Sequence, residues 1–356
     1  MKNANTKTHS TKRPLILSVL SLVLCVTMLM GTTYAWFTDS VTSGTNKIVA
    51  GNLDVEVTHT NAKVTAAETV QGATNLFRDK DGTYYMYASS SVNGIGGVAV
   101  YTSKDLLKWN EKVQVMTLPE GNWSRGGIWA PEVHKYNGKY YLFATINEHT
   151  KWKMSREDWP DYIYRATQIF CSESPEGPFI ATSDFPQTPI DYMALDGTLF
   201  IEDGEPYMVF CHEWVQTVDG TVEYVKLDSN RSKAVTDPVR MFCGSSCCVA
   251  EPDNNSYVTD GCFMYRTKTG KLLMIWASFG PDGYAECIAE SLTGKLAGPW
   301  RQQSEPLFRK DGGHAMIFTD LNGKLRLVLH SPNSGGKERA RLFTLEDTGD
   351  TLKIVE

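Results

Sequence analysis

Residues 137–145, "NGKYYLFAT", join an Asn-Gly pair to an apolar and aromatic run, and this pattern decides the fold. Asn-Gly and Asp-Gly favour tight hairpin turns because both residues accept positive φ angles. The pattern recurs as "DGTYYMYAS", "DGEPYMVFC", "TGKLLMIWA" and "NGKLRLVLH", at residues 81–89, 203–211, 269–277 and 322–330. Successive turn glycines are 56, 66, 66 and 53 residues apart. Five repeats of this length predict an all-β protein, a five-bladed β-propeller with about four strands in each blade.

A second motif follows three of the hairpins. The stretches "YTSKDLLKW" (101–109), "CSESPEGPF" (171–179) and "AESLTGKLAGPW" (289–300) each end a strand in serine and reach an aromatic residue a few positions later. We expect outer strands whose aromatic side chain packs between neighbouring blades. No long segment of helical periodicity follows the N-terminal region, which agrees with an all-β fold.

The N-terminus has the composition of an export signal. Basic residues up to Arg13 precede an apolar run that ends in small residues at Ala35. The run is also long enough for a membrane anchor, so retention in the membrane is the alternative. We expect a signal peptide at 1–35, a partly disordered, leader-derived linker at 36–69, and the propeller at 70–356.

Charge and cysteine content narrow the range of partners. The chain of 356 residues has a formal net charge of −6, and it has no Lys/Arg cluster beyond the N-terminus. A nucleic-acid partner would require a basic face, so we expect none. Removal of Cys25 with the signal leaves seven cysteines, an odd number that does not suggest a complete disulfide framework. Cys243, Cys247 and Cys248 form a group without a CxxC pair or a neighbouring histidine, so we expect a structural or incidental role and no metal site, with one local disulfide as the alternative.

The innermost strand of each blade runs along the central channel, so the residues at the starts of these strands converge. Thr74, Ala130 and Asp196 lie eight positions before their turn glycines, and Asp260 and His314 take the corresponding places before longer turns. Asp196 and Asp260 have two possible roles. Each could be a catalytic carboxyl group, or each could cap the start of its strand through hydrogen bonds to the backbone. Their matching positions favour a catalytic pair. In glycoside hydrolysis by inversion, two such carboxyl groups lie about 6.5–9.5 Å apart.

Four further side chains are candidates for substrate binding. Trp129 begins the inner strand of the second blade, where an aromatic face stacks on sugar rings or packs between blades. Glu132 shares a strand face with Ala130 and could accept a hydrogen bond from a sugar hydroxyl. His212 follows the third hairpin, where it could contact a ligand at the rim of the cleft or pack between blades. Arg266 follows the strand that carries Asp260, and a solvated turn charge is its alternative role.

Three segments together resemble glycoside hydrolase family 43. They are "WAPEVHKYNGKYYLFAT" (129–145), "LDGTLFIEDGEPYMVF" (195–210) and "DGGHAMIF" (311–318), and they occur in the family's order. The resemblance covers the chain from about residue 70 to its end. It implies a five-bladed propeller that cleaves arabinose- or xylose-containing plant polysaccharides with inversion, as arabinofuranosidases and xylosidases do.

The resemblance also implies roles for individual residues. Asp196 would tune the pKa of the general acid, and Asp260 would be that acid at a position where the family usually has glutamate. The general-base aspartate of the first blade falls on Thr74, which cannot act as a base at neutral pH, so hydrolysis would be impaired. Cys262 stands where proline is usual. The histidine at the channel centre is His314, beside which the family places water or a calcium ion; no cofactor is otherwise required.

The leading hypothesis is therefore a secreted or cell-surface glycoside hydrolase that acts on a polysaccharide or oligosaccharide as a monomer. The alternative is a carbohydrate-binding propeller without catalytic activity, which Thr74 favours. A third hypothesis, a surface-matrix protein, rests on the stretch "WFTDSVTSGTNKIVAGNLDVEV" (36–57), which resembles the leader of TasA- and camelysin-type precursors of Gram-positive bacteria. That likeness implies Gram-positive-type export.

Overall fold

The computed structural model describes residues 75–251 and 254–355, together with the backbone of four short strands before them. The chain divides into two units, Met1–Asp54 and Val55–Glu356. In the first unit, strand β1 (Thr42–Ser43) pairs with β2 (Asn46–Lys47). The expected signal peptide, its membrane-anchor alternative and most of the expected linker lie outside the described residues. Within the described part of the chain, no helix is long and apolar enough to cross a membrane.

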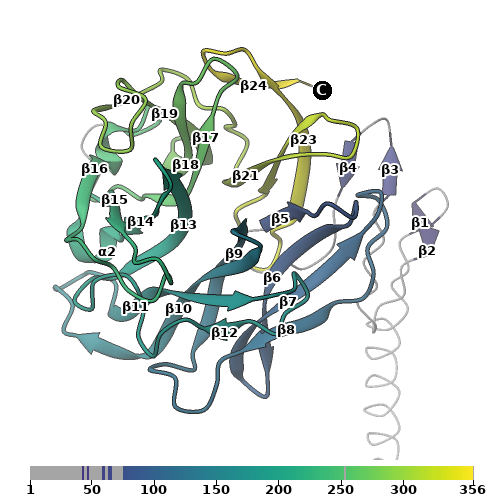
Figure 1. Cartoon of the computed structure of the whole chain (residues 1–356). Coiled ribbons are helices and arrows are strands. Elements are labelled where there is room, and N and C mark those ends of the chain that lie inside the picture. Colours follow the sequence, from purple (N-terminus) through teal and green to yellow (C-terminus); the bar gives the residue numbers. More distant parts are fainter. Residues whose placement is uncertain are drawn as a thin grey trace, which may run out of the picture. The chain divides into compact units, whose positions relative to one another are not determined.

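The second unit is a five-bladed β-propeller, as predicted, with its sheets arranged in a ring (Figure 1). The first blade contains β5 (Asn75–Arg78), β6 (Tyr84–Val92), β7 (Ile95–Ser103) and β8 (Val113–Thr117). The second contains β9 (Gly127–Tyr136), β10 (Lys139–Lys153), β11 (Tyr162–Ser172) and β12 (Ile180–Ala181). The third contains β13 (Ala194–Glu202), β14 (Glu205–His212), β15 (Thr221–Lys226) and β16 (Val239–Cys243), with the short helix α2 (Trp214–Thr217). The fourth contains β17 (Asp260–Arg266), β18 (Leu272–Gly280), β19 (Gly283–Ser291) and β20 (Trp300–Gln302), preceded by the 3₁₀ turn η1 (Gly244–Ser246).

The fifth blade combines the two ends of the second unit. Its strands β21 (Gly313–Thr319), β22 (Leu325–His330), β23 (Ala340–Asp347) and β24 (Leu352–Val355) come from the C-terminal part of the chain. The hairpin of β3 (Thr58–Thr60) and β4 (Lys63–Thr65) joins the same sheet, because β4 pairs with β23. The hairpin precedes residue 70, where we expected the propeller to begin. Its pairing with the last blade connects the N-terminal part of the unit to the C-terminal part.

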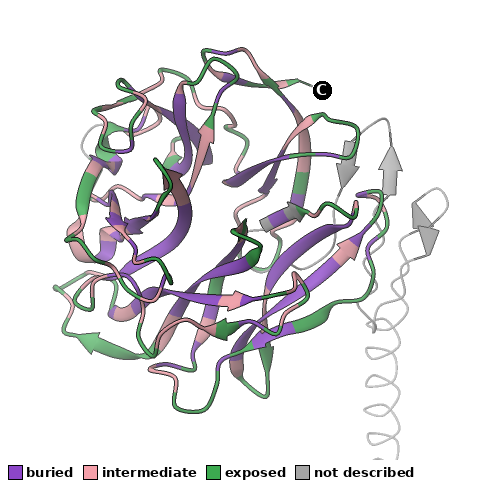
Figure 2. Cartoon of the chain, in the orientation of Figure 1, coloured by how far each residue is buried: buried purple, intermediate pink, exposed green. Residues whose placement is uncertain are grey.

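The five repeated turns are hairpins that connect the first and second strands of each blade. Their glycines all have positive φ angles, which glycine adopts without steric cost. These are Gly82, Gly138, Gly204, Gly270 and Gly323, with φ of 78°, 82°, 84°, 89° and 76°. The apolar runs that follow form the buried second strands, which lie in the purple interior of the blades in Figure 2.

The aromatic residues of the second motif pack between blades, as expected. Trp109 of the first blade belongs to a buried cluster that includes Met316 of the fifth. Phe179 of the second blade contacts Tyr87 of the first, with ring centroids 6.2 Å apart. Trp300 belongs to a cluster shared by the third and fourth blades. These contacts fix each blade against its neighbour and so hold the central strands in place.

A β-bulge interrupts four of the inner strands near their starts. The first bulged residue has a positive φ in each case: Ala130, Asp196, Gly261 and His314. Asp260 is the last paired residue before its bulge, so it lies one position earlier than Asp196 in the structural repeat. The prediction that the two aspartates are equivalent is therefore wrong by one residue. Counting back from the turn could not detect this offset, because the turn of the fourth blade differs in length.

Candidate active site

A cavity of about 860 Å³ opens at the end of the channel where the inner strands begin. All five blades contribute to its wall. The lining residues are Ser89–Ser91, Gly127–Ala130, Arg165, Leu195, Asp196, Glu213, Trp214, Val258, Asp260, Phe279, Tyr284, His314, His330, Asn333, Gly335, Gly336 and Glu338. Asp196, Asp260, Trp129 and His314 therefore meet in one site, as the repeat predicted.

Asp196 is held at the centre of the site by its neighbours. Its backbone N–H donates to Thr145 Oγ1 at 2.9 Å, and its Oδ2 accepts a hydrogen bond from the backbone N–H of Gly261 at 3.0 Å. A Cβ atom on Gly197 would lie 2.6 Å from Thr167 Cγ2, so any larger residue after Asp196 would force buried side chains to shift. The Asp-Gly pair thus shapes the backbone and aims the carboxyl group at the fourth blade.

Asp260 projects into the same space from β17. It keeps partial exposure to the cavity, and its Oδ2 accepts a hydrogen bond from the Tyr284 hydroxyl group at 3.1 Å. Burial and, after it, the charge of Asp196 raise the pKa of Asp260 to about 8, against the opposing effects of Tyr284 and Arg165. Burial also raises the pKa of Asp196, to about 7. Each carboxyl group is thus more readily protonated than it would be in water.

Arg165 and Glu213 form a buried ion pair beside the two aspartates. Arg165 Nη1 lies 2.8 Å from Glu213 Oε1, and the guanidinium group lies over the Trp129 ring, 4.7 Å from its centroid. Burial raises the pKa of Glu213 to about 7, although Arg165 counteracts part of this rise. Sequence analysis singled out neither residue as a site residue. The only signal was the position of Glu213 directly after the third-blade strand.

Two histidines of the fifth blade lie in the wall as neutral rings. Burial lowers the pKa of both His314 and His330 to about 4. His314 Nδ1 lies 3.7 Å from Asp196 Oδ2, which is therefore a contact between a neutral ring and a carboxyl group. A Cβ atom on Gly261 would lie 2.6 Å from His314 Cγ, so this close approach also requires glycine.

The remaining predicted binding residues differ in their placement. Trp129 lines the cavity and is 41% exposed, so its ring is available to a ligand. Glu132 is buried and absent from the lining, and it accepts a hydrogen bond from Thr198 Oγ1 at 2.5 Å and contacts His134. It supports the floor of the site through Thr198, two residues beyond Asp196.

His212 and Arg266 are not among the lining residues. His212 stacks on Tyr192 with centroids 3.8 Å apart, which is the packing alternative weighed for it. Arg266 Nη1 donates to the backbone oxygens of Gly270 and Gly294 at 3.1 Å and 3.2 Å, at the turn end of its strand. Arg266 therefore takes the turn role, at the opposite end of the strand from Asp260.

Thr74 lies outside the described residues. The first blade contributes Ser89, Ser90 and Ser91 to the described wall. Glu338, from the loop between β22 and β23, is a fourth carboxyl side chain of the cavity besides Asp196, Glu213 and Asp260, and sequence analysis missed it. Its Oε2 atom is buried and has no hydrogen-bond partner.

Several carboxyl groups with raised pKa values, held in one cavity at the end of a propeller channel, are an arrangement suited to glycoside hydrolysis. Fold and site thus define a glycoside hydrolase. The family model described as "Glycosyl hydrolases family 43" matches residues 70–347, and the chain belongs to this family.

Solved structures agree with this assignment. An endo-arabinase of Bacteroides thetaiotaomicron is 33% identical with a TM-score of 0.66, over 80% of this chain and 93% of that one. A thermostable family-43 glycoside hydrolase has a TM-score of 0.67 over 84% of this chain and 96% of that one; at 21% identity this likeness shows the fold alone.

Two curated relatives are more distant in sequence. An extracellular endo-α-(1→5)-L-arabinanase of Bacillus subtilis is 22% identical over 253 residues, which is 66% of this chain and 69% of that protein. A protein of Escherichia coli is 24% identical over 270 residues, and the chain spans 45% of its length. At the N-terminus, the model described as "Camelysin metallo-endopeptidase" matches residues 10–74, which confirms the likeness of the leader.

Proposed function

We propose that the propeller hydrolyses O-glycosidic bonds in arabinose- or xylose-containing plant polysaccharides, with inversion at the anomeric carbon. The pairing of Asp196 with Asp260 in the cavity carries the proposal. Burial and the charge of Asp196 keep a proton on Asp260 at neutral pH, which is what a general acid requires.

In this reaction Asp260 donates its proton to the glycosidic oxygen as the bond from that oxygen to the anomeric carbon breaks. When Asp196 is ionised, its negative charge raises the pKa of Asp260 and so favours the protonated form of the acid. The Gly261 N–H, which donates to Asp196, fixes the direction of that carboxylate. Tyr284 holds the Asp260 side chain through its hydroxyl group. Water attacks the opposite face of the sugar and loses its proton to a base.

Glu338 is our candidate for that base. The Arg165 ion pair holds Glu213, whereas Glu338 Oε2 is buried at the cavity without a partner and can accept a proton or a hydrogen bond. Its loop belongs to the fifth blade, which is next to the first blade in the ring (Figure 1). The first blade is where the family resemblance places the base, at Thr74. A carboxylate supplied from the neighbouring blade would compensate for that threonine.

Sugar rings have aromatic surfaces to stack on at the mouth of the site. Trp129 and Phe279 line the cavity and are 41% and 43% exposed. An arabinan-type substrate is supported by the endo-arabinase of Bacteroides thetaiotaomicron, which is 33% identical. The camelysin-type leader and the extracellular relative support a secreted or cell-surface location, by Gram-positive-type export. We further propose that the protein acts as a monomer and without nucleic acid.

A calcium ion beside His314 remains a prediction. Calcium takes about six to eight oxygen ligands, and the nearest acidic oxygen to His314 Nδ1 is Asp196 Oδ2 at 3.7 Å. Such an ion would therefore be held mostly by water. The proposed reaction does not involve such an ion.

A carbohydrate-binding propeller without turnover is the second candidate, because the first blade offers serines to the described wall and threonine at the implied base position. Assays of the full-length chain on arabinan, arabinoxylan and aryl glycosides separate the two functions. We expect turnover in the wild type, and a fall of about 10²–10⁴-fold in Glu338→Gln that Thr74→Asp restores. Binding without turnover in the wild type, with turnover gained in Thr74→Asp, would establish the second candidate instead.

A further inference from the structure

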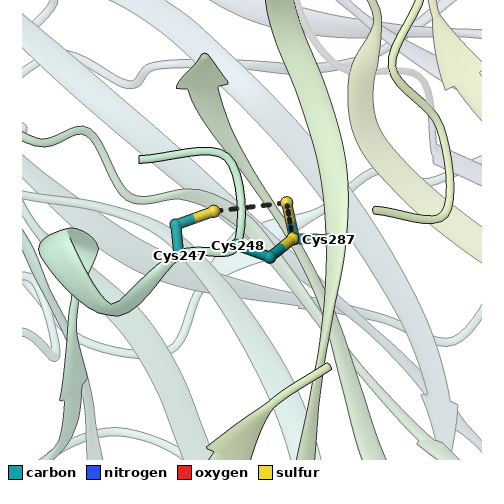
Figure 3. A group of neighbouring side chains, drawn as sticks. All are labelled: Cys247, Cys248 and Cys287. Carbon is teal, nitrogen blue, oxygen red and sulfur yellow. Dashed lines mark hydrogen bonds between the residues drawn. The ribbon is translucent and has the colours of Figure 1, made fainter. Parts of the chain in front are cut away.

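Three cysteine sulfurs lie close together at the fourth blade, and none of the three residues lines the catalytic cavity. Cys247 and Cys248 follow η1 in the segment that joins the third blade to β17, and Cys287 lies in the middle of β19. Cys247 Sγ is 3.2 Å from Cys287 Sγ, and Cys248 Sγ is 3.7 Å from it. All three sulfurs lie within 4.8 Å of one another, and Figure 3 shows the side chains pointing together. The sequence concealed this cluster, because its third member is 39 residues beyond Cys248.

These separations fit coordination of one metal ion. Zinc–thiolate bonds are about 2.3 Å long, so two thiolates on a tetrahedral zinc ion are about 3.8 Å apart. The separation of 3.7 Å is close to this value, the separation of 3.2 Å is shorter, and the third sulfur pair lies within 4.8 Å. A disulfide would join two of the sulfurs at about 2.05 Å and leave the third without a partner. A single disulfide therefore does not account for the convergence of all three.

The surroundings leave a side of the cluster open. Cys247 and Cys287 are buried, with exposures of 6% and 0%, while Cys248 is half-buried and faces a hollow of about 240 Å³. Glu251, Asp282 and Arg309 line the same hollow. The hollow leaves room for a water molecule as a fourth ligand on this side. The Arg309 guanidinium group, also in the wall, would offset the negative charge of three thiolates on a divalent ion.

We propose that Cys247, Cys248 and Cys287 bind one thiophilic metal ion, with Zn²⁺ as the expected occupant. The ion would tie the segment of residues 244–259 to β19. That segment leads directly into Asp260 at the start of β17, and β19 carries Tyr284, which donates a hydrogen bond to Asp260. A structural metal here would therefore fix both partners of that hydrogen bond. The site does not depend on whether the cavity is catalytic.

Metal analysis and spectroscopy of the full-length chain test the proposal. We expect about one Zn²⁺ per chain in protein purified without chelator. Co²⁺ added to the chelator-treated protein should give thiolate-to-cobalt charge-transfer absorption, and added Zn²⁺ should raise the melting temperature, because a ligand that binds the folded state stabilises it.

Cys248→Ser removes one thiolate at a half-buried position with almost no change in volume, so it should fold and lose both the metal and the cobalt band. Cys171→Ser is the matched control, since Cys171 is a free thiol on β11 outside the cluster. Protein that folds without metal, gives no cobalt band and shows by mass spectrometry a disulfide from Cys287 to Cys247 or Cys248 would overturn the proposal. Equal metal content in Cys248→Ser and wild type would do the same.

Discussion

The dependence of the Asp260 pKa on Asp196 gives the sharpest prediction. After burial, the charge of Asp196 is the largest influence that raises the Asp260 pKa. Asp196→Asn removes this charge and keeps the shape of the side chain, and the amide oxygen can still accept from the Gly261 N–H. The perturbation is therefore electrostatic rather than steric.

Its magnitude follows from the like-charge effect. A neighbouring charge shifts a buried pKa by about 1–3 units, and each unit corresponds to about 1.4 kcal/mol. The wild-type pKa of Asp260 is raised to about 8, so kcat/KM should fall as pH rises through that value and the acid loses its proton. In Asp196→Asn the alkaline limb should move down by about 1–3 pH units, and the rate at neutral pH should fall because the acid is then largely ionised there.

The assay is kcat/KM for arabinan between pH 4 and 10, in wild type, Asp196→Asn and Asp203→Asn. Asp203 is the matched control: it belongs to the second Asp-Gly pair of the same blade, and it lies in an exposed hairpin turn where it pairs with Lys295. Its variant should keep the wild-type profile. An alkaline limb that stays in place or moves upward in Asp196→Asn would refute the proposed coupling.

Three further predictions follow from the same contacts. Asp260→Asn should raise the melting temperature relative to wild type, more at pH 9 than at pH 5. Because the pKa of Asp260 is higher in the folded state than in the unfolded state, this group stabilises the fold at pH values below its unfolded pKa, and the contribution is lost as the pH rises through about 8. An equal difference in melting temperature at both pH values would contradict this. Gly261→Ala should cost more than Gly138→Ala, measured by denaturant unfolding. Both glycines have positive φ, but a Cβ at Gly261 would lie 2.6 Å from His314 Cγ whereas Gly138 has open space, and left-handed strain alone costs about 1–3 kcal/mol. Arg165→Met should destabilise by about 3–5 kcal/mol because it leaves Glu213 buried without its partner. The double variant with Glu213→Gln should recover most of that loss, and additive losses would argue against a buried pair.

The blades could be predicted because their signals are local. Each hairpin depends on a glycine with positive φ followed by an apolar run, and both features occupy about nine consecutive residues. The aromatic residues that pack between blades, such as Trp109, follow their strands at short and regular distances. Counting back from the hairpins also located Asp196 and His314 at equivalent bulges.

The position of Asp260 could not be predicted to the residue by counting back from the turn glycine. Its offset of one residue relative to the bulge is not visible in the sequence, because the fourth turn differs in length and the count from its glycine has no fixed reference. Arg266 belongs to the acid-bearing strand but lies at its turn end, so the structure supports its turn role and not the substrate-binding role.

The sequence by itself determined the five hairpins, the ring of blades they require and the presence of acidic side chains near the channel. Tertiary structure alone decided which side chains meet. Arg165 and Glu213, Gly261 and Asp196, and the sulfurs of residues 247, 248 and 287 come together across blades or across long stretches of chain. The closure of the ring brings these groups together, and burial among them sets the pKa values on which the proposed chemistry depends. Neither closure nor burial is a property of any short segment.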